Sequence, residues 1–477
     1  MTTTSRDSGA AAHDTVPIPR GPRPRANAPA PRPTAVGPTR PVTTGNTPPP
    51  RPRPSAAGPA RPVAGPTADG PTRPVATGTP PVPRARLTGV DATRGVALLG
   101  MMAIHALYPY DDAGRPTVMY SLAAGRAAAV FAVLAGVGIV FLTGRRRVLL
   151  GLPGRRTAAV LAARAAVIGG IGLVLGGFAD SDIAMVILPY YAVLFLIAVP
   201  LVLLPTAAVA AVGTAVVAGM PFVSHVVRAR IPLPSGLNHS FADLFTDPVG
   251  MVRELLLTGE FPVLPWTTYL CAGIVVGRLR LHSSRTAAAL LVSGATTAVA
   301  AVGLSAWLLG PMGGLAHIQA AGTGDADIPV TEILTFGADG TTPTTTMWWL
   351  ALQAPHTGTP LDLLHTTGTA VALLGALLLL GHVTVPGLRR VIDPVLAPLA
   401  AAGSMTLTLY TAHIVFMSSP LDDFDAVPGY VLQVVTALLF AVVWRRLVGR
   451  GPLETLVTRA AHGAAAAVEG PSGRHGA

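Results

Sequence analysis

The sequence predicts an all-α, polytopic integral membrane protein of about ten transmembrane helices, with a disordered N-terminal tail rich in proline and arginine. Composition is the first observation: 51% of the 477 residues are hydrophobic and only 12% are charged, whereas soluble domains carry about 25% charged residues. Apolar runs are the second: from residue 87 onward they reach the ~20 residues that a helix needs to cross a bilayer. Together these observations exclude an ordinary water-soluble enzyme.

Residues 1–86 are predicted to be a disordered tail in the cytoplasm. They contain 22 of the 46 prolines, 12 arginines and three acidic residues, and they have almost none of the aromatic and long aliphatic side chains that build a core. Most of the net charge of +11 therefore belongs to the tail, so we expect no nucleic-acid partner for the rest of the chain. The tail could be a ligand for proline-binding modules or anionic lipid headgroups, but a solvated spacer is the favoured interpretation.

Ten apolar runs between residues 87 and 460 are predicted to be helices, because backbone groups in lipid must be paired within each segment. Residues 461–477 are expected to form a second disordered tail. The single cysteine, Cys271, excludes an internal disulfide. The ten runs lie at 91–110, 124–143, 158–178, 183–204, 206–226, 262–279, 287–309, 362–382, 394–416 and 427–447.

Charges between the runs predict the orientation. The loops after the second, sixth, eighth and tenth runs carry arginines, among them Arg145, Arg146 and Arg147, and the opposite loops carry aspartates. By the positive-inside rule, both termini are expected in the cytoplasm and the protein in the cell (inner or plasma) membrane, with membrane lipids around it. Two outer loops, 227–261 and 310–361, are long enough to form a lid or a substrate platform.

Three ionisable residues in the first run are candidates for function, because charge within a membrane is costly. Asp91 and Arg94 are three residues apart and can pair on one helix face. Arg94 and His105 are separated by three helical turns plus about 20°, so they share a face about 16.5 Å apart. A cation that holds an anionic cofactor and a base nearer the other side would suit a reaction across the bilayer. Alternatively, Asp91 and Arg94 anchor the helix end and His105 is a structural hydrogen bonder between helices.

The segment Val90–His105 resembles the first helix of the transmembrane acyltransferases, in which an Asp precedes an Arg that is followed, after ten residues, by a His. This superfamily includes bacterial acyltransferases of O-antigen and similar glycans, the lysosomal heparan-alpha-glucosaminide N-acetyltransferase and the YeiB-like proteins. Further stretches resemble the YeiB-like branch in particular. In chain order they are Gly125–Gly136, Ile187–Tyr191, Phe261–Trp266, Ala354–Gly358, Leu407–Tyr410 and Gly451–Glu454.

The resemblance implies an enzyme that takes an acyl group, expected to be acetyl, from acetyl-CoA or another acyl-CoA in the cytoplasm. The acceptor would be a hydroxyl or amine of an extracytoplasmic glycan, lipid or metabolite. Arg94, together with Arg145, Arg146 and Arg147, would hold the CoA phosphates. His105 would remove the acceptor's proton or transiently carry the acyl group.

One feature departs from the heparan enzyme. There the position of His105 holds an Asn, and the catalytic His lies in the first outer segment, but the corresponding segment here, 107–116, contains no His. His105 must then supply the base, as in the glycan acyltransferases, or another helix must. His356 and His413 lie in family-like stretches and are the next catalytic candidates. No metal site is expected, because no pair of histidines has a metal-ligand spacing.

Two rival functions stay open. A transporter or flippase would use the same intramembrane charges to gate a pathway, and broken helices in two related halves would favour it, but the sequence shows no convincing internal repeat. The other rival is a non-catalytic membrane scaffold that displays the tail. The sequence leaves the acceptor, the acyl length and the choice between a monomer and a homo-oligomer undecided.

Overall fold

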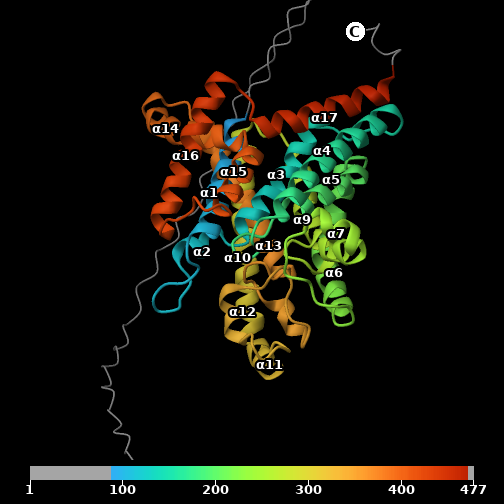
Figure 1. Cartoon of the computed structure of the whole chain (residues 1–477), viewed down its shortest axis with the longest axis vertical. Helices are drawn as coiled ribbons and strands as arrows, with labels where there is room; N and C mark the ends of the chain where they lie inside the picture. The colour runs from blue at the N-terminus through green and yellow to red at the C-terminus, as the bar shows by residue number, and fades with distance from the viewer. Residues whose placement is uncertain (1–86, 471–477) are drawn as a thin grey trace, which may run out of the picture. The chain divides into compact units, whose positions relative to one another are not determined.

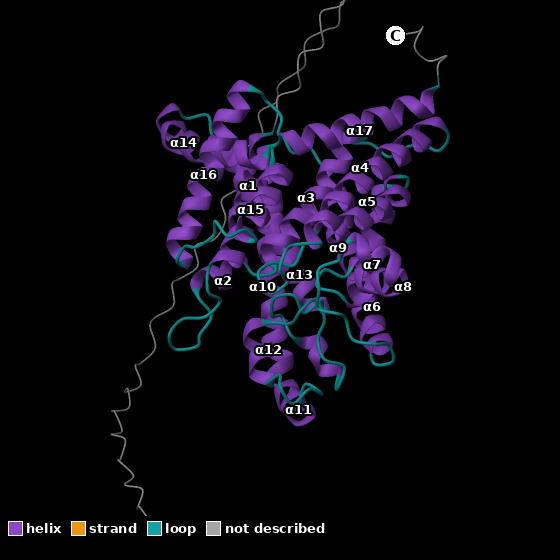
Figure 2. Ribbon diagram, in the orientation of Figure 1, coloured by secondary structure: helices purple, strands orange, loops and turns teal. Residues whose placement is uncertain are grey.

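The computed structural model describes residues 87–470, and every regular element in this range is a helix (Figure 1, Figure 2). The all-α prediction is confirmed for these residues, while the predicted N-terminal tail lies outside them. In chain order the elements are α1 (Thr88–Ala106), α2 (Val118–Ala123), α3 (Arg126–Leu142), α4 (Leu152–Gly176), α5 (Leu188–Val202), α6 (Thr206–Arg228), α7 (Phe241–Thr246), α8 (Pro248–Arg253), η1 (Glu254–Thr258), α9 (Val263–Gly277), α10 (Ser284–Leu309), α11 (Gly314–Ala321), α12 (Val330–Phe336), η2 (Met347–Ala351), α13 (Pro360–Gly381), α14 (Pro386–Gly403), α15 (Thr406–Met417), α16 (Ala426–Leu447) and α17 (Pro452–Glu469).

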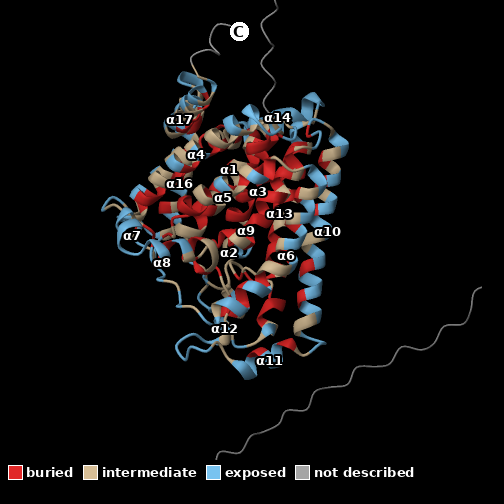
Figure 3. Ribbon diagram, turned by 90° about the vertical axis from the view of Figure 1, so that its right-hand side faces the viewer, coloured by how far each residue is buried: buried red, intermediate tan, exposed pale blue. Residues whose placement is uncertain are grey.

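The apolar helices are buried to very different degrees. More than half of α13 and of the α2–α3 segment is buried, whereas less than a third of α4, α6, α10 and α16 is. Figure 3 shows the buried residues gathered around α1, α3 and α13, and exposed residues along α10. The exposed face of α10 is itself apolar and includes Val292, Val299 and Trp307. Exposed apolar surface of this extent fits helices that face lipid.

Six helical segments are long and apolar enough to cross a membrane, or up to seven if the bent pair α14–α15 is one span. The six are α2–α3, α4, α6, α10, α13 and α16. α5 and α9 are apolar but shorter, and α1 carries Asp91, Arg94 and His105. Each of the ten predicted runs overlaps one of these helices or the bent pair. The chain therefore fits a multi-pass membrane protein, and the number of ten spans stays a prediction.

The ninth run is not one straight helix, contrary to the prediction, because α14 and α15 meet at an angle of 78°. Gly403, the last residue of α14, packs against α1 so closely that a Cβ would overlap the Asp91 carbonyl. The carboxylate of Glu454 caps α15 by accepting from the backbone N–H groups of Leu407 and Thr408, at 2.8 and 3.2 Å. These N–H groups have no partner within their own helix. Close packing on α1 and a cap from α17 thus stabilise the bend.

The C-terminal boundary also differs from the prediction, which expects disorder from residue 461. α17 continues to Glu469 and packs along α4. Its buried residues recur every four positions, at Val457, Ala461 and Ala465, which is the pattern of an amphipathic helix. Arg156 and Glu469 form an ion pair at 2.9 Å between the two helices. The helical part therefore extends nine residues beyond the predicted boundary at residue 460, and residues 471–477 lie outside the described range.

Candidate functional site

α1 lines two adjoining cavities. The first, which we call the arginine cavity, has a volume of about 1100 Å³ and is lined by Arg94 near the start of α1. The second, the histidine cavity, has a volume of about 1460 Å³ and is lined by His105 near the end of α1. Met101 and Ile187 line both cavities, so the cavities adjoin at these two side chains. One helix thus presents a cation to one cavity and an imidazole to the other.

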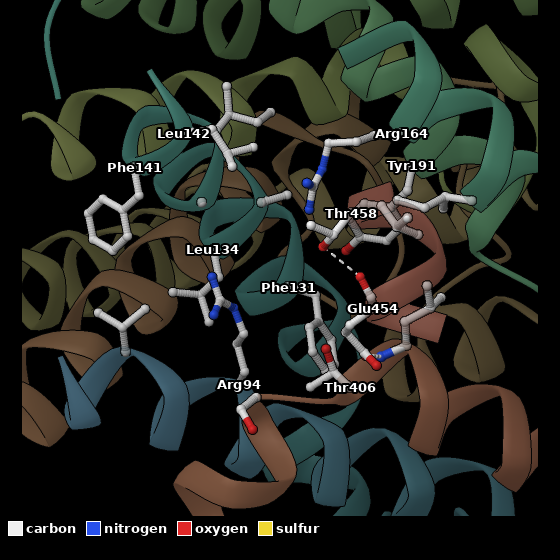
Figure 4. Close-up of a pocket in the computed structure, with 18 of the residues that line it drawn as sticks. Arg94, Phe131, Leu134, Phe141, Leu142, Arg164, Tyr191, Thr406, Glu454 and Thr458 are labelled. Atoms are coloured by element: carbon white, nitrogen blue, oxygen red, sulfur yellow. Dashed lines mark hydrogen bonds between the residues drawn. The ribbon is translucent and has the colours of Figure 1, made fainter. Parts of the chain in front are cut away.

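The arginine cavity carries an excess of positive charge. It is lined by four arginines, Arg94, Arg145, Arg164 and Arg450. Figure 4 shows Arg94 and Arg164 reaching into it from different helices. Its two carboxylates already have partners: Asp91 accepts from Arg94 at 3.0 Å, which confirms the predicted pair, and Glu454 caps α15. Guanidinium groups match phosphate oxygens well, so this cavity suits a phosphate-bearing ligand.

Of the three loop arginines predicted to hold phosphates, the structure brings only Arg145 to this cavity. Arg146 and Arg147 are exposed and do not line it. Arg147 instead donates from Nε to the carbonyl of Leu203 at 2.6 Å. Arg164 was missed, although the signal was available, because it is a charged residue inside the third apolar run.

His356 enters the histidine cavity from the loop between η2 and α13. Its φ of +53° is left-handed, a conformation that costs a non-glycine residue about 1–3 kcal/mol and clusters at functional sites. Two bonds hold the loop in place. The Thr359 hydroxyl donates to the Leu352 carbonyl at 2.5 Å, and the Gly358 backbone N–H donates to the Asp362 carboxyl at 3.0 Å.

Glu260 faces His356, with Oε1 3.1 Å from Nδ1. Burial, together with the nearby Asp339, raises the pKa of Glu260 well above its usual range. Burial also lowers the pKa of His356 to about 4. Both shifts favour the uncharged forms of the two groups, so a carboxyl and an imidazole face each other at the wall of the histidine cavity. Sequence reasoning missed Glu260, although it directly precedes the family-like stretch Phe261–Trp266.

His413, the third predicted histidine, does not line the cavity but lies behind His105. Its Nε2 is 3.0 Å from Nδ1 of His105, and its own Nδ1 is 2.5 Å from Oε1 of Gln433 on α16. His105 therefore forms a hydrogen bond between helices, which was one of the two interpretations drawn from the sequence. It also lines a cavity, as a catalytic role requires. The structure brings His105, His356 and His413 into one region from three separate segments.

The rest of the histidine cavity is acidic. Apart from Glu260, its lining has one arginine, Arg228, against five acidic residues, which are Asp182, Glu254, Asp325, Glu332 and Asp339. Arg228 is already engaged, because it donates to the Thr342 carbonyl at 2.7 Å and to the Ser224 hydroxyl at 3.1 Å. The two cavities thus differ in charge, and a ligand with an amine suits the histidine cavity better than a phosphate does.

Residues 86–309 match the family model described as "Heparan-alpha-glucosaminide N-acetyltransferase, catalytic". This region runs from α1 to the end of α10, so it includes Arg94, His105 and Glu260, and it ends before His356 and His413. The match supports the relation to the heparan-alpha-glucosaminide N-acetyltransferase-like acyltransferases that the sequence predicts, while the narrower resemblance to the YeiB-like branch stays a prediction. No curated protein matches the chain.

Proposed function

The chain is related to the heparan-alpha-glucosaminide N-acetyltransferase-like acyltransferases, and we propose from this relation that it is an integral membrane acyltransferase. The reaction moves an acyl group, in the first instance acetyl, from cytoplasmic acyl-CoA to a hydroxyl or amine of an extracytoplasmic glycan, lipid or metabolite. One observation carries the proposal: α1 lines two adjoining cavities, with Arg94 in one and His105 in the other. The arginine cavity opens to the cytoplasm in this proposal, as the positive-inside rule requires.

The donor binds in the arginine cavity. Arg94, Arg164 and Arg450 hold the phosphates of CoA through charge-assisted hydrogen bonds. Arg94 and His105 are about 16.5 Å apart along α1, a distance comparable to the reach of an extended pantetheine arm. The arm passes Met101 and Ile187, and the thioester then lies close to His105.

The acceptor binds in the histidine cavity. Nε2 of His105 takes the proton of the acceptor's hydroxyl or amine, and the freed oxygen or nitrogen attacks the thioester carbon. The new C–O or C–N bond forms, the C–S bond breaks, and the CoA thiolate takes the proton from the imidazolium. In a two-step variant, Nε2 first attacks the thioester carbon, the C–S bond breaks and CoA leaves as the thiolate. The acceptor then attacks the acyl group, the N–acyl bond to His105 breaks, and the acceptor's proton goes to the thiolate. The five acidic residues that line the cavity besides Glu260 favour an acceptor with an amine.

The rival function is transport, and the bent pair α14–α15 is the observation that favours it, because broken helices build the substrate sites of many transporters. Such sites come from broken helices in two related halves. Among residues 87–470, one bent pair is present. Acyl transfer accounts for both cavities and for the family match, so it is the better supported function.

The test is turnover of radiolabelled acetyl-CoA by the purified protein with amine and hydroxyl acceptors. His105→Ala should reduce transfer by at least the ~10²–10⁴-fold usually assigned to a general base, while acetyl-CoA still binds. Arg94→Ala should mainly raise KM for acetyl-CoA, and Arg94→Lys should recover only part of it, because an ammonium cannot replace a bidentate guanidinium. Arg146→Ala is the matched control, since Arg146 is exposed and lies outside the cavity.

Each outcome has a distinct meaning. If a folded His105→Ala protein keeps wild-type turnover, the base is elsewhere, and His356 becomes the next candidate. If neither Arg94 nor His105 affects acetyl-CoA binding or transfer, the acyltransferase proposal fails and transport becomes the leading function.

A further inference from the structure

Three polar side chains form a chain of hydrogen bonds from α16 through α15 to α1. Oε1 of Gln433 lies 2.5 Å from Nδ1 of His413, and Nε2 of His413 lies 3.0 Å from Nδ1 of His105. Gln433 and His413 are only 9% and 4% exposed. Among the described residues, neither side chain has a further hydrogen-bond partner that would compete with this arrangement.

The two imidazoles meet edge to edge. Their planes differ by 8° and their centroids are 5.2 Å apart, while the facing nitrogens are 3.0 Å apart. The nitrogen–nitrogen distance is shorter than the centroid separation by roughly the width of one ring. The nitrogens therefore lie on the line between the two centroids, and each lone pair or N–H points at the other ring. This is the geometry of a directed hydrogen bond rather than of face-to-face stacking.

The direction of the bonds follows from Gln433. An amide oxygen can only accept, so Nδ1 of His413 must carry a proton. A neutral imidazole carries one proton, so Nε2 of His413 accepts and Nδ1 of His105 donates to it. Nε2 of His105 is then unprotonated. If the Gln433 amide were turned over, every bond would reverse and Nε2 of His105 would carry a proton. The orientation of the amide therefore decides which tautomer His105 adopts.

A second hydrogen bond fixes the position of Gln433 relative to α1. Tyr430 lies one helical turn before Gln433 on α16, so both face the same side, and its hydroxyl donates to the Leu99 carbonyl of α1 at 3.3 Å. His413 lies on α15, which meets α14 at 78°, and its ring contacts both His105 of α1 and Gln433 of α16. The arrangement thus links three helices to one ring nitrogen.

We propose that Gln433 and His413 are positioning residues, which hold His105 in the tautomer whose Nε2 is unprotonated and available to the acyl-transfer reaction. The effect on rate rests on the proposed function, whereas the tautomer itself does not. His413 acts through His105 and does not touch the substrate. The same logic operates in Ser-His-Asp enzymes, where an acceptor behind the histidine sets its tautomer.

Kinetics of two Gln433 variants test the role. Gln433→Met removes the acceptor and should lower kcat between about 10-fold and the ~10⁴-fold that a wrong histidine tautomer costs, with KM for acetyl-CoA unchanged. Gln433→Glu keeps an acceptor, so it should retain most of kcat. Its carboxylate also favours a protonated imidazole, so the acidic limb of the kcat–pH profile should move to higher pH. His356 and its partner Glu260 are the other titratable groups close to His105, and they are unchanged in both variants.

Thr436→Val is the matched control, because Thr436 is exposed on the same helix and forms no hydrogen bond with His413. It should leave kcat and the pH profile as in the wild type. A merely structural role for Gln433 predicts equal losses in the Met and Glu variants and no shift of the profile, and that result would overturn the positioning role.

The tautomer is read directly by ¹⁵N solid-state NMR of the full-length protein in lipid, labelled at histidine, with His105→Ala and His413→Ala for assignment. We expect Nδ1 protonated and Nε2 unprotonated in both rings, and loss of this pattern at His105 in Gln433→Met. A proton on Nε2 of His105 in the wild type would overturn the inference. If the wild type transfers no acyl group to any acceptor, the proposed function fails, while the spectrum still decides the tautomer.

Discussion

Glu260 and His356 bring a carboxyl and an imidazole within 3.1 Å of each other in a buried place. In water such a pair would be charged, but burial raises the pKa of Glu260 well above its usual range and lowers the pKa of His356 to about 4. Both shifts favour the uncharged forms because a charge loses its hydration on burial. Burial thus disfavours an ion pair between Glu260 and His356 beside the histidine cavity.

This neutrality predicts a pH dependence of stability. In the unfolded chain Glu260 loses its proton near its ordinary pKa of about 4.3, whereas in the folded protein burial raises this pKa and the proton is kept to higher pH. The folded state then binds more protons, so its stability should fall as the pH rises toward the folded pKa. Glu260→Gln should leave Tm near the wild-type value at pH 5 and flatten its decline between pH 5 and pH 9.

Thermal unfolding in detergent across this range measures the effect. Glu332→Gln is the control, because Glu332 also lines the histidine cavity but is exposed, and it should leave the slope unchanged. A lower Tm for Glu260→Gln at pH 7, with an unchanged slope, would mean that Glu260 and His356 form an ion pair instead.

Site residues can be predicted from the sequence mainly when they are ionisable and lie within an apolar run. Asp91, Arg94 and His105 stand out because ionisable residues within an apolar run are rare, and the Asp91–Arg94 pair follows from their spacing alone. Gln433 gives no such signal: it is neutral, and its partner His413 comes from another helix. The arrangement of the predicted histidines depends on loop and helix packing, which spacing along one helix does not reveal.

At the scale of the elements, the bend between α14 and α15 depends on a carboxylate in α17. Glu454 accepts from two backbone N–H groups at the start of α15 and from the Thr408 hydroxyl at 2.6 Å. Apolar periodicity predicts the run correctly as helical, but it does not predict the break, because the cap comes from a residue about fifty positions later. Gly403 likewise does not predict the bend from the sequence, because its role depends on the close contact with the Asp91 carbonyl of α1.

Removing the cap should destabilise the protein and misalign His413. Hydrogen bonds to a charged group are worth about 1.5–3 kcal/mol each, so Glu454→Ala should lower the free energy of unfolding by about 2 kcal/mol or more. It should also lower kcat, because α15 carries His413. Glu469→Ala is the matched control at the other end of α17: its ion pair with Arg156 is exposed, and such pairs are worth about 0–1 kcal/mol.

Chemical denaturation in detergent and acetyl transfer measure the two effects of Glu454→Ala. Equal stability of the Glu454→Ala and Glu469→Ala proteins would contradict the capping role.

At the scale of the whole molecule, the charge difference between the two cavities parallels that between the loops. One side has arginine-rich loops and the arginine cavity, and the other has aspartate-rich loops and the acidic histidine cavity. The arginine cavity has four arginines, and the histidine cavity has six acidic residues and one arginine. The sequence predicts this asymmetry through its loop charges, and the helical part is predicted well because lipid requires helices. The two adjoining cavities were not predicted, because they arise from packing between helices that are distant in the sequence.

The asymmetry leads to a prediction about orientation, with the arginine cavity on the cytoplasmic side and the histidine cavity outside. Cys271, the single native cysteine, is buried, so cysteines introduced at exposed positions can be labelled selectively. Asp327→Cys, in the long loop before α12, should react with a membrane-impermeant maleimide in intact cells. Arg146→Cys, in the loop after α3, should react only after the membrane is permeabilised.

Both positions are exposed and lie outside the cavity linings, so neither change should reduce acetyl transfer. Labelling of Arg146→Cys from outside would reverse the orientation, and acyl-CoA from the cytoplasm could then no longer reach the arginine cavity.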